Sequence, residues 1–207
     1  MKPSKRLGLA LVITAPSGAG KSTLIKRLLA EFPQAGFSIS CTTRAPRPGD
    51  RPGIDYEFLS VEEFKARIAK GHFTEWAEVY GNYYGTQKQA VLDMLAAGRD
   101  VLFDIDVQGA KALKANLGFG NTVFILPPSR QELERRLTGR GSDSPETIAR
   151  RLAVAKSEVA QAGWFNHIVV NDNLDTAYDE LRAVYLAQRS HPDLHPGLVE
   201  SVVGTWE

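Results

Sequence analysis

The chain of 207 residues carries 25 basic and 24 acidic side chains, and its net charge of +1 gives no electrostatic reason to expect nucleic acid or a membrane surface as a partner. Its 43% hydrophobic content suits one globular domain with a sizeable core and room for inserted subdomains. The single cysteine, Cys41, excludes an intrachain disulfide, so we expect a protein of the cytoplasm.

The first residues superficially resemble a secretion signal, because Lys2, Lys5 and Arg6 precede an apolar run. Cleavage near that run would destroy the strand that leads into the glycine-rich turn described next, so we favour an uncleaved chain. No apolar stretch of the sequence approaches the roughly 20 residues that a membrane-spanning helix needs.

An apolar run at residues 9–14 predicts a buried strand, and a helical pattern follows from residue 21 to about residue 31. The turn between them is rich in glycine and leads into a lysine and two hydroxyl residues. Such a turn can wrap a phosphate with its amide groups at a helix N-terminus, where the helix dipole favours an anion. We predict that this turn binds the phosphates of a nucleoside triphosphate through Ala15, Pro16, Ser17, Gly18, Ala19, Gly20, Lys21, Ser22 and Thr23.

The chemistry of each residue in this turn suggests its role. Gly18 and Gly20 let the backbone curl, Lys21 reaches the β- and γ-phosphates, and the Ser22 hydroxyl helps to hold Mg²⁺. The strict phosphate-loop pattern begins with glycine, whereas this chain has Ala15 at that position. Because alanine tolerates only negative φ, we expect a negative φ at Ala15.

Further strand signals alternate with helical patterns along the chain. The strand signals lie at 101–105, 122–126 and 167–170, and the helical patterns lie at 108–115, 130–137, 145–162 and 174–188. This alternation predicts an α/β protein of the P-loop NTPase fold, with a parallel sheet flanked by helices.

Two stretches interrupt the alternation. Residues 37–86 hold short strand signals at 55–59 and 73–80 and a helical pattern at 61–70, which indicates an inserted mixed α/β subdomain. Residues 138–144, Thr-Gly-Arg-Gly-Ser-Asp-Ser, are rich in glycine and hydroxyl residues and lie between two arginine-bearing helical patterns, which favours a helical lid. Beyond residue 190, two His-Pro pairs break any helix, and the apolar side chains there, including Trp206, could pack on the body or on another subunit.

Several blocks along the chain resemble the guanylate kinase family. They are the phosphate loop and residues 40–47, 55–56, 75–76, 81–86, 104–109 and 135–141. Unrelated enzymes share a phosphate loop, but Thr-Thr-Arg-Ala-Pro-Arg at 42–47 and Gly-Asn-Tyr-Tyr-Gly at 81–85, in this order, are far more specific. The resemblance covers residues 9–188.

The resemblance implies transfer of the ATP γ-phosphoryl group to GMP, and also to dGMP, giving ADP and GDP with Mg²⁺ in purine nucleotide metabolism. It implies a core of residues 1–36, 87–126 and 157–190, a GMP-binding subdomain of residues 37–86 and a lid of residues 127–156, followed by a tail of residues 191–207. ATP and GMP are then the partners, and the sequence does not indicate an oligomeric state.

The acceptor site combines residue chemistry with this resemblance. Arg44 and Arg47 could hold the GMP phosphate with guanidinium forks, although alone they would be typical of a solvated surface. The resemblance makes Glu75 the guanine reader, since one carboxylate accepts from both N1–H and the N2 amine, a pair of donors that adenine lacks. The predicted GMP-binding residues are Ser40, Arg44, Arg47, Tyr56, Glu75, Tyr84, Gly85, Thr86 and Asp106.

The charged side chains expected to act in phosphoryl transfer lie at the end of a predicted strand and in the predicted lid. Asp104 and Asp106 are two residues apart after an apolar run, a spacing that would place both on one strand face, and we assign Asp104 to Mg²⁺ together with Ser22. The resemblance assigns Arg136, Arg140 and Arg151 to the transferring group, and a continuous helix would place the first two together. The predicted catalytic residues are therefore Lys21, Arg44, Arg136, Arg140 and Arg151, and Asn171 is expected to contact the adenine edge.

Three other functions stay open at this point. A guanylate-kinase-like domain that has lost catalysis could bind phosphorylated protein segments, although the phosphate loop and the arginines speak against this. Another nucleotide or sugar-phosphate kinase would share the scaffold, and Glu75 with Ser40 and Thr86 argues against it. A regulatory phosphate-loop ATPase or GTPase would turn over triphosphate without an acceptor.

Overall fold

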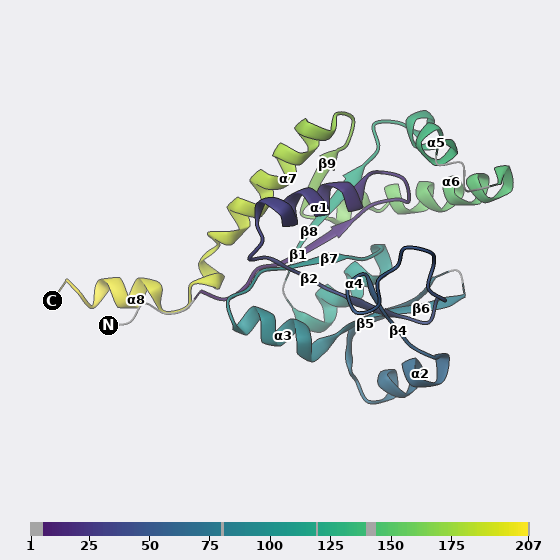
Figure 1. Ribbon diagram of the computed structural model, residues 1–207. Coiled ribbons are helices and arrows are strands. Elements are labelled where there is room, and N and C mark those ends of the chain that lie inside the picture. Colours follow the sequence, from purple (N-terminus) through teal and green to yellow (C-terminus); the bar gives the residue numbers. More distant parts are fainter. Residues whose placement is uncertain (1–5, 80, 119, 140–143, 207) are drawn as a thin grey trace.

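The computed structural model describes residues 6–79, 81–118, 120–139 and 144–206, and it divides the chain between two sheets (Figure 1). The larger sheet has five parallel strands in the order β2-β7-β1-β8-β9. Their bounds are Gly36–Phe37 (β2), Val101–Asp104 (β7), Ala10–Thr14 (β1), Asn121–Leu126 (β8) and His167–Val170 (β9). A parallel sheet that leads from its central strand into a glycine-rich turn is the P-loop NTPase fold predicted from the sequence.

The central strand β1 is buried at all five positions, as expected for a parallel sheet covered on both faces. On one face, Leu11 and Ile13 pack against α1 (Lys21–Glu31) and α7 (Leu174–Arg189). On the other face, Ala10 and Val12 pack with Phe103 against α3 (Lys88–Ala96) and α4 (Val107–Leu117). The alternation of side chains along β1 therefore builds both halves of the core.

The smaller sheet is mixed, as the inserted subdomain was predicted to be. Its order is β4-β3-β6-β5, where β3 and β4 are parallel and the other two pairs are antiparallel. One face packs Cys41 and Phe73 against Phe64 of α2 (Val61–Ala69), and a Cβ atom on Gly85 would lie only 3.0 Å from Phe64 Cζ. The bounds are Ser40–Thr42 (β3), Tyr56–Phe58 (β4), Phe73–Val79 (β5) and Asn82–Gln87 (β6).

Two helices, α5 (Arg130–Thr138) and α6 (Pro145–Val159), form an arm beside the larger sheet (Figure 1). Each begins at a serine cap: the hydroxyl of Ser129 accepts a hydrogen bond from the amide of Glu132, and that of Ser144 accepts one from Thr147. Leu133 and Leu137 of α5 pack with Ala155 of α6. Local signals therefore set where each helix begins, and a small apolar core joins the two.

Several elements differ from the sequence-based expectation. The strands β3 and β6 and the helix α3 were not predicted, because β6 is a polar run without apolar alternation and α3 begins without a side-chain cap. The helix predicted to reach residue 162 ends at Val159, and a separate 3-10 turn, Ala162–Trp164, follows it. The helix α5 ends at Thr138, so the helical continuity that we expected to join Arg136 to Arg140 is wrong. Residue 140 itself lies outside the described residues.

The end of the chain projects away from the body (Figure 1). After α7, a 3-10 turn at Pro192–Leu194 leads to the short helix α8 (Leu198–Val203), and Trp206 is 80% exposed. Packing of Trp206 on the body, which the sequence left open, is therefore not seen. No helix in the described residues has both the length and the apolar character to cross a membrane.

Candidate functional site

The phosphate loop connects β1 to α1 and requires both of its glycines. Gly18 and Gly20 each have φ 94, a left-handed conformation that side chains other than glycine rarely adopt. Space is also limiting, because a Cβ atom would lie 2.9 Å from Leu137 Cδ2 at Gly18 and 2.2 Å from Asn171 Nδ2 at Gly20. The loop is thus packed against the lid helix α5 and the end of β9.

Asn171 supports the phosphate loop through hydrogen bonds. It follows β9, it is buried, and its side-chain amide donates a hydrogen bond of 2.7 Å to the carbonyl oxygen of Ala19. Its own carbonyl accepts a hydrogen bond of 2.9 Å from the Arg136 guanidinium. Asn171 therefore connects the phosphate loop to the helix α5, a contact that the sequence did not predict.

Lys21 lies where two cavities meet. One cavity, of about 390 Å³, is lined by the phosphate loop and by Arg151. The other, of about 160 Å³, is lined by residues of the smaller sheet and of the β7 end. Lys21, Tyr56 and Tyr84 line both cavities, so a group bound in one would lie next to a group bound in the other.

Four predicted acceptor residues form a single row across the smaller sheet. Tyr56 of β4 is paired with Ser40 of β3, Ser40 is paired with Thr86 of β6, and Thr86 is paired with Glu75 of β5. Directly paired residues point to the same side of a sheet, which here is the side opposite the Cys41 and Phe64 core. Three members of this row, Ser40, Tyr56 and Glu75, line the small cavity, although Ser40 and Glu75 are 35 positions apart in the chain.

Glu75 is buried, with 4% of its surface exposed, rather than being the exposed acid that its sequence alone would suggest. Burial raises the pKa of its carboxyl group to about 7, and repulsion from Asp106 acts in the same direction. A Cβ atom on Gly109 would lie 3.0 Å from Glu75 Oε2, so the first turn of α4 passes close to this carboxylate. Such a group gains most from a ligand that offers hydrogen-bond donors.

Asp50 organises the two arginines predicted to bind phosphate. Its carboxylate accepts a hydrogen bond of 2.9 Å from the Arg44 guanidinium and one of 2.7 Å from the backbone amide of Arg47. The Arg44 guanidinium also lies 5.2 Å from the centre of the Tyr56 ring. Arg47 is exposed, and neither arginine lines the small cavity. Asp50 was not predicted from the sequence.

The predicted placement of Asp104 and Asp106 on one strand face is wrong. The strand β7 ends at Asp104, and Asp106 is the N-cap of α4, where its carboxylate accepts a hydrogen bond of 2.8 Å from the amide of Gly109. A helix start rather than strand alternation therefore orients Asp106. Both side chains still line the small cavity, because the carboxyl end of the sheet opens into it.

The lid arginines occupy different surroundings. Arg136 is held by an ion pair of 2.7 Å with Glu132 and by the Asn171 carbonyl, whereas Arg151 lines the phosphate-loop cavity. The neighbouring Arg135 and Arg150 are both exposed. Arg140 lies outside the described residues.

Comparisons with known proteins agree with the fold and the site described above. A family model described as guanylate kinase matches residues 8–188. The guanylate kinase of Oleidesulfovibrio alaskensis is 55% identical over 201 residues, which cover 97% of this chain and 98% of that protein. The chain belongs to the guanylate kinase family. The guanylate kinase of Nitratidesulfovibrio vulgaris is 54% identical over 202 residues, or 98% of each chain.

Solved structures of guanylate kinases and related domains share this fold. A crystal structure of guanylate kinase from Anaplasma phagocytophilum is 30% identical and has a TM-score of 0.80, covering 96% of this chain and 95% of that chain. The SH3-kinase fragment of tight junction protein 3 is 18% identical with a TM-score of 0.50, which shows the fold alone. It covers 90% of this chain but 58% of that chain, so the same fold also occurs inside longer proteins.

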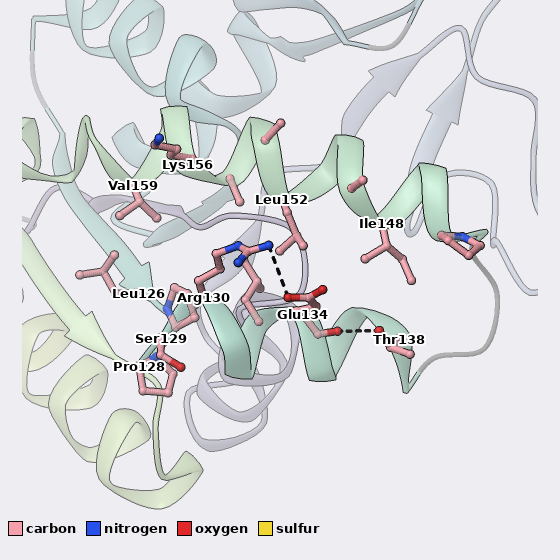
Figure 2. Close-up of a pocket in the computed structure, with 16 residues that line it drawn as sticks. Leu126, Pro128, Ser129, Arg130, Glu134, Thr138, Ile148, Leu152, Lys156 and Val159 are labelled. Carbon is pink, nitrogen blue, oxygen red and sulfur yellow. Dashed lines mark hydrogen bonds and ion pairs between the residues drawn. The ribbon is translucent and has the colours of Figure 1, made fainter.

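A larger groove in this guanylate kinase family member lies between the lid helices (Figure 2). It has a volume of about 1020 Å³, and its walls include Leu133 of α5 and Ile148 and Leu152 of α6. An ion pair of 3.6 Å between Arg130 and Glu134 lies along α5 at its side. None of the residues predicted to bind ATP or GMP lines this groove, and no sequence signal pointed to it.

Proposed function

We propose that the chain is an active guanylate kinase, which transfers the γ-phosphoryl group of ATP to GMP and to dGMP and yields ADP and GDP. The observation that carries this proposal is the buried Glu75 carboxylate, which lines a cavity that meets the phosphate-loop cavity at Lys21. A binding module has no need for a phosphate loop beside an acceptor pocket. The assignment to purine nucleotide metabolism follows from these substrates.

Guanine recognition is assigned to the row of Ser40, Thr86 and Glu75. An ionised Glu75 would accept hydrogen bonds from guanine N1–H and from its N2 amine. Adenine offers no such pair, and an unpaired buried carboxylate costs about 1–3 kcal/mol or more, which supports strong selection against AMP. The hydroxyls of Ser40 and Thr86, with Gly85 packed behind them, complete the surroundings of the base.

The GMP phosphate is assigned to Arg44, Arg47, Tyr56 and Tyr84. Since Asp50 occupies the Arg44 guanidinium, the incoming phosphate would compete with this carboxylate for the fork. A phosphate dianion with several oxygens can engage both arginines at once, which favours the exchange. Asp106 would lie on the nucleoside side of the same cavity.

The donor triphosphate is assigned to residues 15–23, with Lys21 at the β- and γ-phosphates. Family members use a divalent metal with ATP, and we propose Mg²⁺ held by Ser22 and Asp104. A hydroxyl and a carboxylate beside the phosphate site suit Mg²⁺, which keeps several waters and binds through one or two protein oxygens. Among the described residues, no cluster of three or more acidic, histidine or cysteine side chains could hold a metal alone, which supports a metal that arrives with the nucleotide.

The transfer step is assigned to an in-line attack by a GMP phosphate oxygen. That oxygen is already ionised, so the chain needs no general base. Lys21, the metal and the arginines Arg136, Arg140 and Arg151 would spread positive charge over the transferring group. Closure of the lid, residues 127–156, and of the GMP subdomain, residues 37–86, onto the core would exclude water and prevent hydrolysis of ATP. We place this enzyme in the cytoplasm.

The decisive experiment measures ADP production from Mg·ATP with GMP, dGMP, AMP, CMP, UMP or dTMP, and without acceptor. Rapid turnover with GMP and slower turnover with dGMP supports the proposal. Turnover with another base would contradict the role of Glu75, and turnover without acceptor would indicate an ATPase. If no condition yields ADP, the catalytically inactive binding module becomes the better description.

A further inference from the structure

Glu158 is an acidic residue of the phosphate-loop cavity that no sequence pattern pointed to. It lies in the last turn of α6 and lines this cavity together with Val154 and Arg151. These three positions are spaced i, i+3 and i+7, so they share the α6 face that is turned toward the loop. Lys21 belongs to the opposite wall of the same cavity.

The surroundings of Glu158 are unfavourable for a carboxylate. Burial raises its pKa to about 7, repulsion from Asp106 adds to the increase, and attraction to Lys21 opposes it. Within the described part of the chain, its side chain takes part in no hydrogen bond or ion pair, whereas Glu132 and Glu134 of the same arm are both paired with arginines. A half-buried carboxylate without a direct partner costs stability, which is typical of groups kept for function.

Lys21 is held on the other side by the end of β7. Its Nζ atom lies 2.5 Å from Asp104 Oδ1 and donates a hydrogen bond of 3.3 Å to the carbonyl oxygen of Ile105. Both contacts draw the ammonium group toward the sheet, whereas the phosphate-loop cavity opens between the loop and α6. Glu158 lines this cavity together with Lys21, and the two side chains attract each other electrostatically.

We propose that Glu158 is a positioning residue, which draws the Lys21 ammonium group away from Asp104 and toward the transferring phosphoryl group. This inference rests on the proposed kinase function. Arg151 lies on the same face of α6 as Glu158. If α6 approached the phosphate loop, Arg151 would come close to the phosphate and Glu158 would come close to Lys21 at the same time. The ammonium group between them would offset the repulsion between Glu158 and the nucleotide.

The test compares Glu158→Gln with Glu158→Asp and with the matched control Glu146→Gln, which removes an exposed carboxylate from the first turn of α6. The glutamine variant keeps the shape but loses the charge, so we expect kcat at saturating ATP and GMP to fall about 10-fold, in line with the cost of a misplaced catalytic group. The KM for GMP should stay within about twofold, since Glu158 is not part of the small cavity. The aspartate variant should recover part of kcat, and the control should match wild type.

Two measurements separate positioning from packing. Calorimetric affinity for a non-hydrolysable ATP analogue, without GMP, should fall in Glu158→Gln, while its melting temperature should be unchanged or raised. Wild-type kcat and analogue affinity in this variant would overturn the inference, and so would equal losses in both variants with a lowered melting temperature. If the wild-type protein did not phosphorylate GMP, the proposed function would be contradicted. The affinities of wild type and Glu158→Gln for the ATP analogue would still test the role of Glu158.

Discussion

The Nζ atom of Lys21 lies 2.5 Å from Oδ1 of Asp104, so the lysine predicted to bind phosphate is paired with the carboxylate predicted to support the metal. Both side chains are partly exposed, with 17% and 27% of their surfaces accessible, and such a pair contributes little to stability. Binding of a metal–nucleotide complex would engage both partners at once, the ammonium with the phosphates and the carboxylate with the metal. The pair therefore keeps two reactive charges compensated until substrate arrives.

Replacement of Lys21 by methionine should abolish most activity without unfolding the protein. Loss of a charge that acts on the transferring group costs about 10²–10³-fold in kcat, and the weak pair with Asp104 adds little to the free energy of unfolding. Steady-state ADP production and thermal melting measure the two effects. Lys26→Met, on the exposed side of α1, is the control and should behave as wild type. Turnover within a few-fold of wild type in Lys21→Met would contradict the assigned role.

Glu75→Gln should damage recognition of the acceptor rather than of the donor. The amide keeps one acceptor oxygen but places a donor against a guanine donor, so kcat/KM for GMP should fall about 10- to 100-fold while the KM for ATP changes little. The comparison is Glu78→Gln on the exposed face of the same strand. A glutamine variant that still prefers GMP by the wild-type margin over AMP would show that another residue reads the base.

The raised pKa of Glu75 predicts a dependence of stability on pH. A carboxyl group with a folded pKa of about 7 and an ordinary value of 4.5 favours folding while it is protonated, and this contribution is lost as the pH rises through about 7. Glu75→Gln should therefore be more stable than wild type at pH 8, by up to about 3 kcal/mol, and should lose this advantage near pH 5. Urea unfolding at the two pH values measures the difference. An equal difference at both would mean that Glu75 titrates in its normal range.

We expect a substitution of Asp100 to lower the stability of the fold without changing the activity. Its carboxylate has 1% of its surface exposed and accepts hydrogen bonds from the amide of Leu9 (2.9 Å) and the hydroxyl of Tyr185 (2.7 Å), and it forms ion pairs with Arg6 and Arg189. Asp100→Asn should cost about 1–3 kcal/mol, because it removes the charge that pairs with two partly buried guanidinium groups and puts an amide donor among buried donors. Denaturant unfolding should show this loss, while kcat of the folded fraction stays at the wild-type level. Asp179→Asn, an exposed change, is the control.

Local patterns were sufficient for much of the fold. The strand at His167–Val170 was predicted to the residue, and the helix at Lys21–Glu31 was predicted with its start at residue 21 and its end at about residue 31, because a short apolar run is bounded by polar residues and an amphipathic period follows Gly20. The strand β6 was missed, since its residues Asn-Tyr-Tyr-Gly-Thr-Gln are polar or small and do not alternate with apolar side chains. Patterns of hydrophobicity cannot recover a strand of this composition.

Within the site, the contacts between distant segments were what the sequence did not predict. Asn171 and Ala19 are joined by a hydrogen bond although 152 residues separate them, and Glu158 lines the same cavity as Lys21 from a distant helix. Asp106 was misplaced for a different reason, since the strand ends two residues earlier than the spacing argument assumed. Motifs identified the segments, whereas the contacts between segments required the three-dimensional arrangement.

The row of Tyr56, Ser40, Thr86 and Glu75 is built from four aligned strands, so under the proposed recognition of guanine the choice of base would depend on their alignment. Sliding β3 by one residue would turn Ser40 toward the apolar side and present Cys41 to the base, since neighbouring residues of a strand point to opposite faces. A misaligned subdomain could remain compact and still bind phosphate while losing discrimination between purines. Under the proposed function, fidelity would depend on how a small sheet is assembled, and selection for it would act on folding as much as on the contact residues.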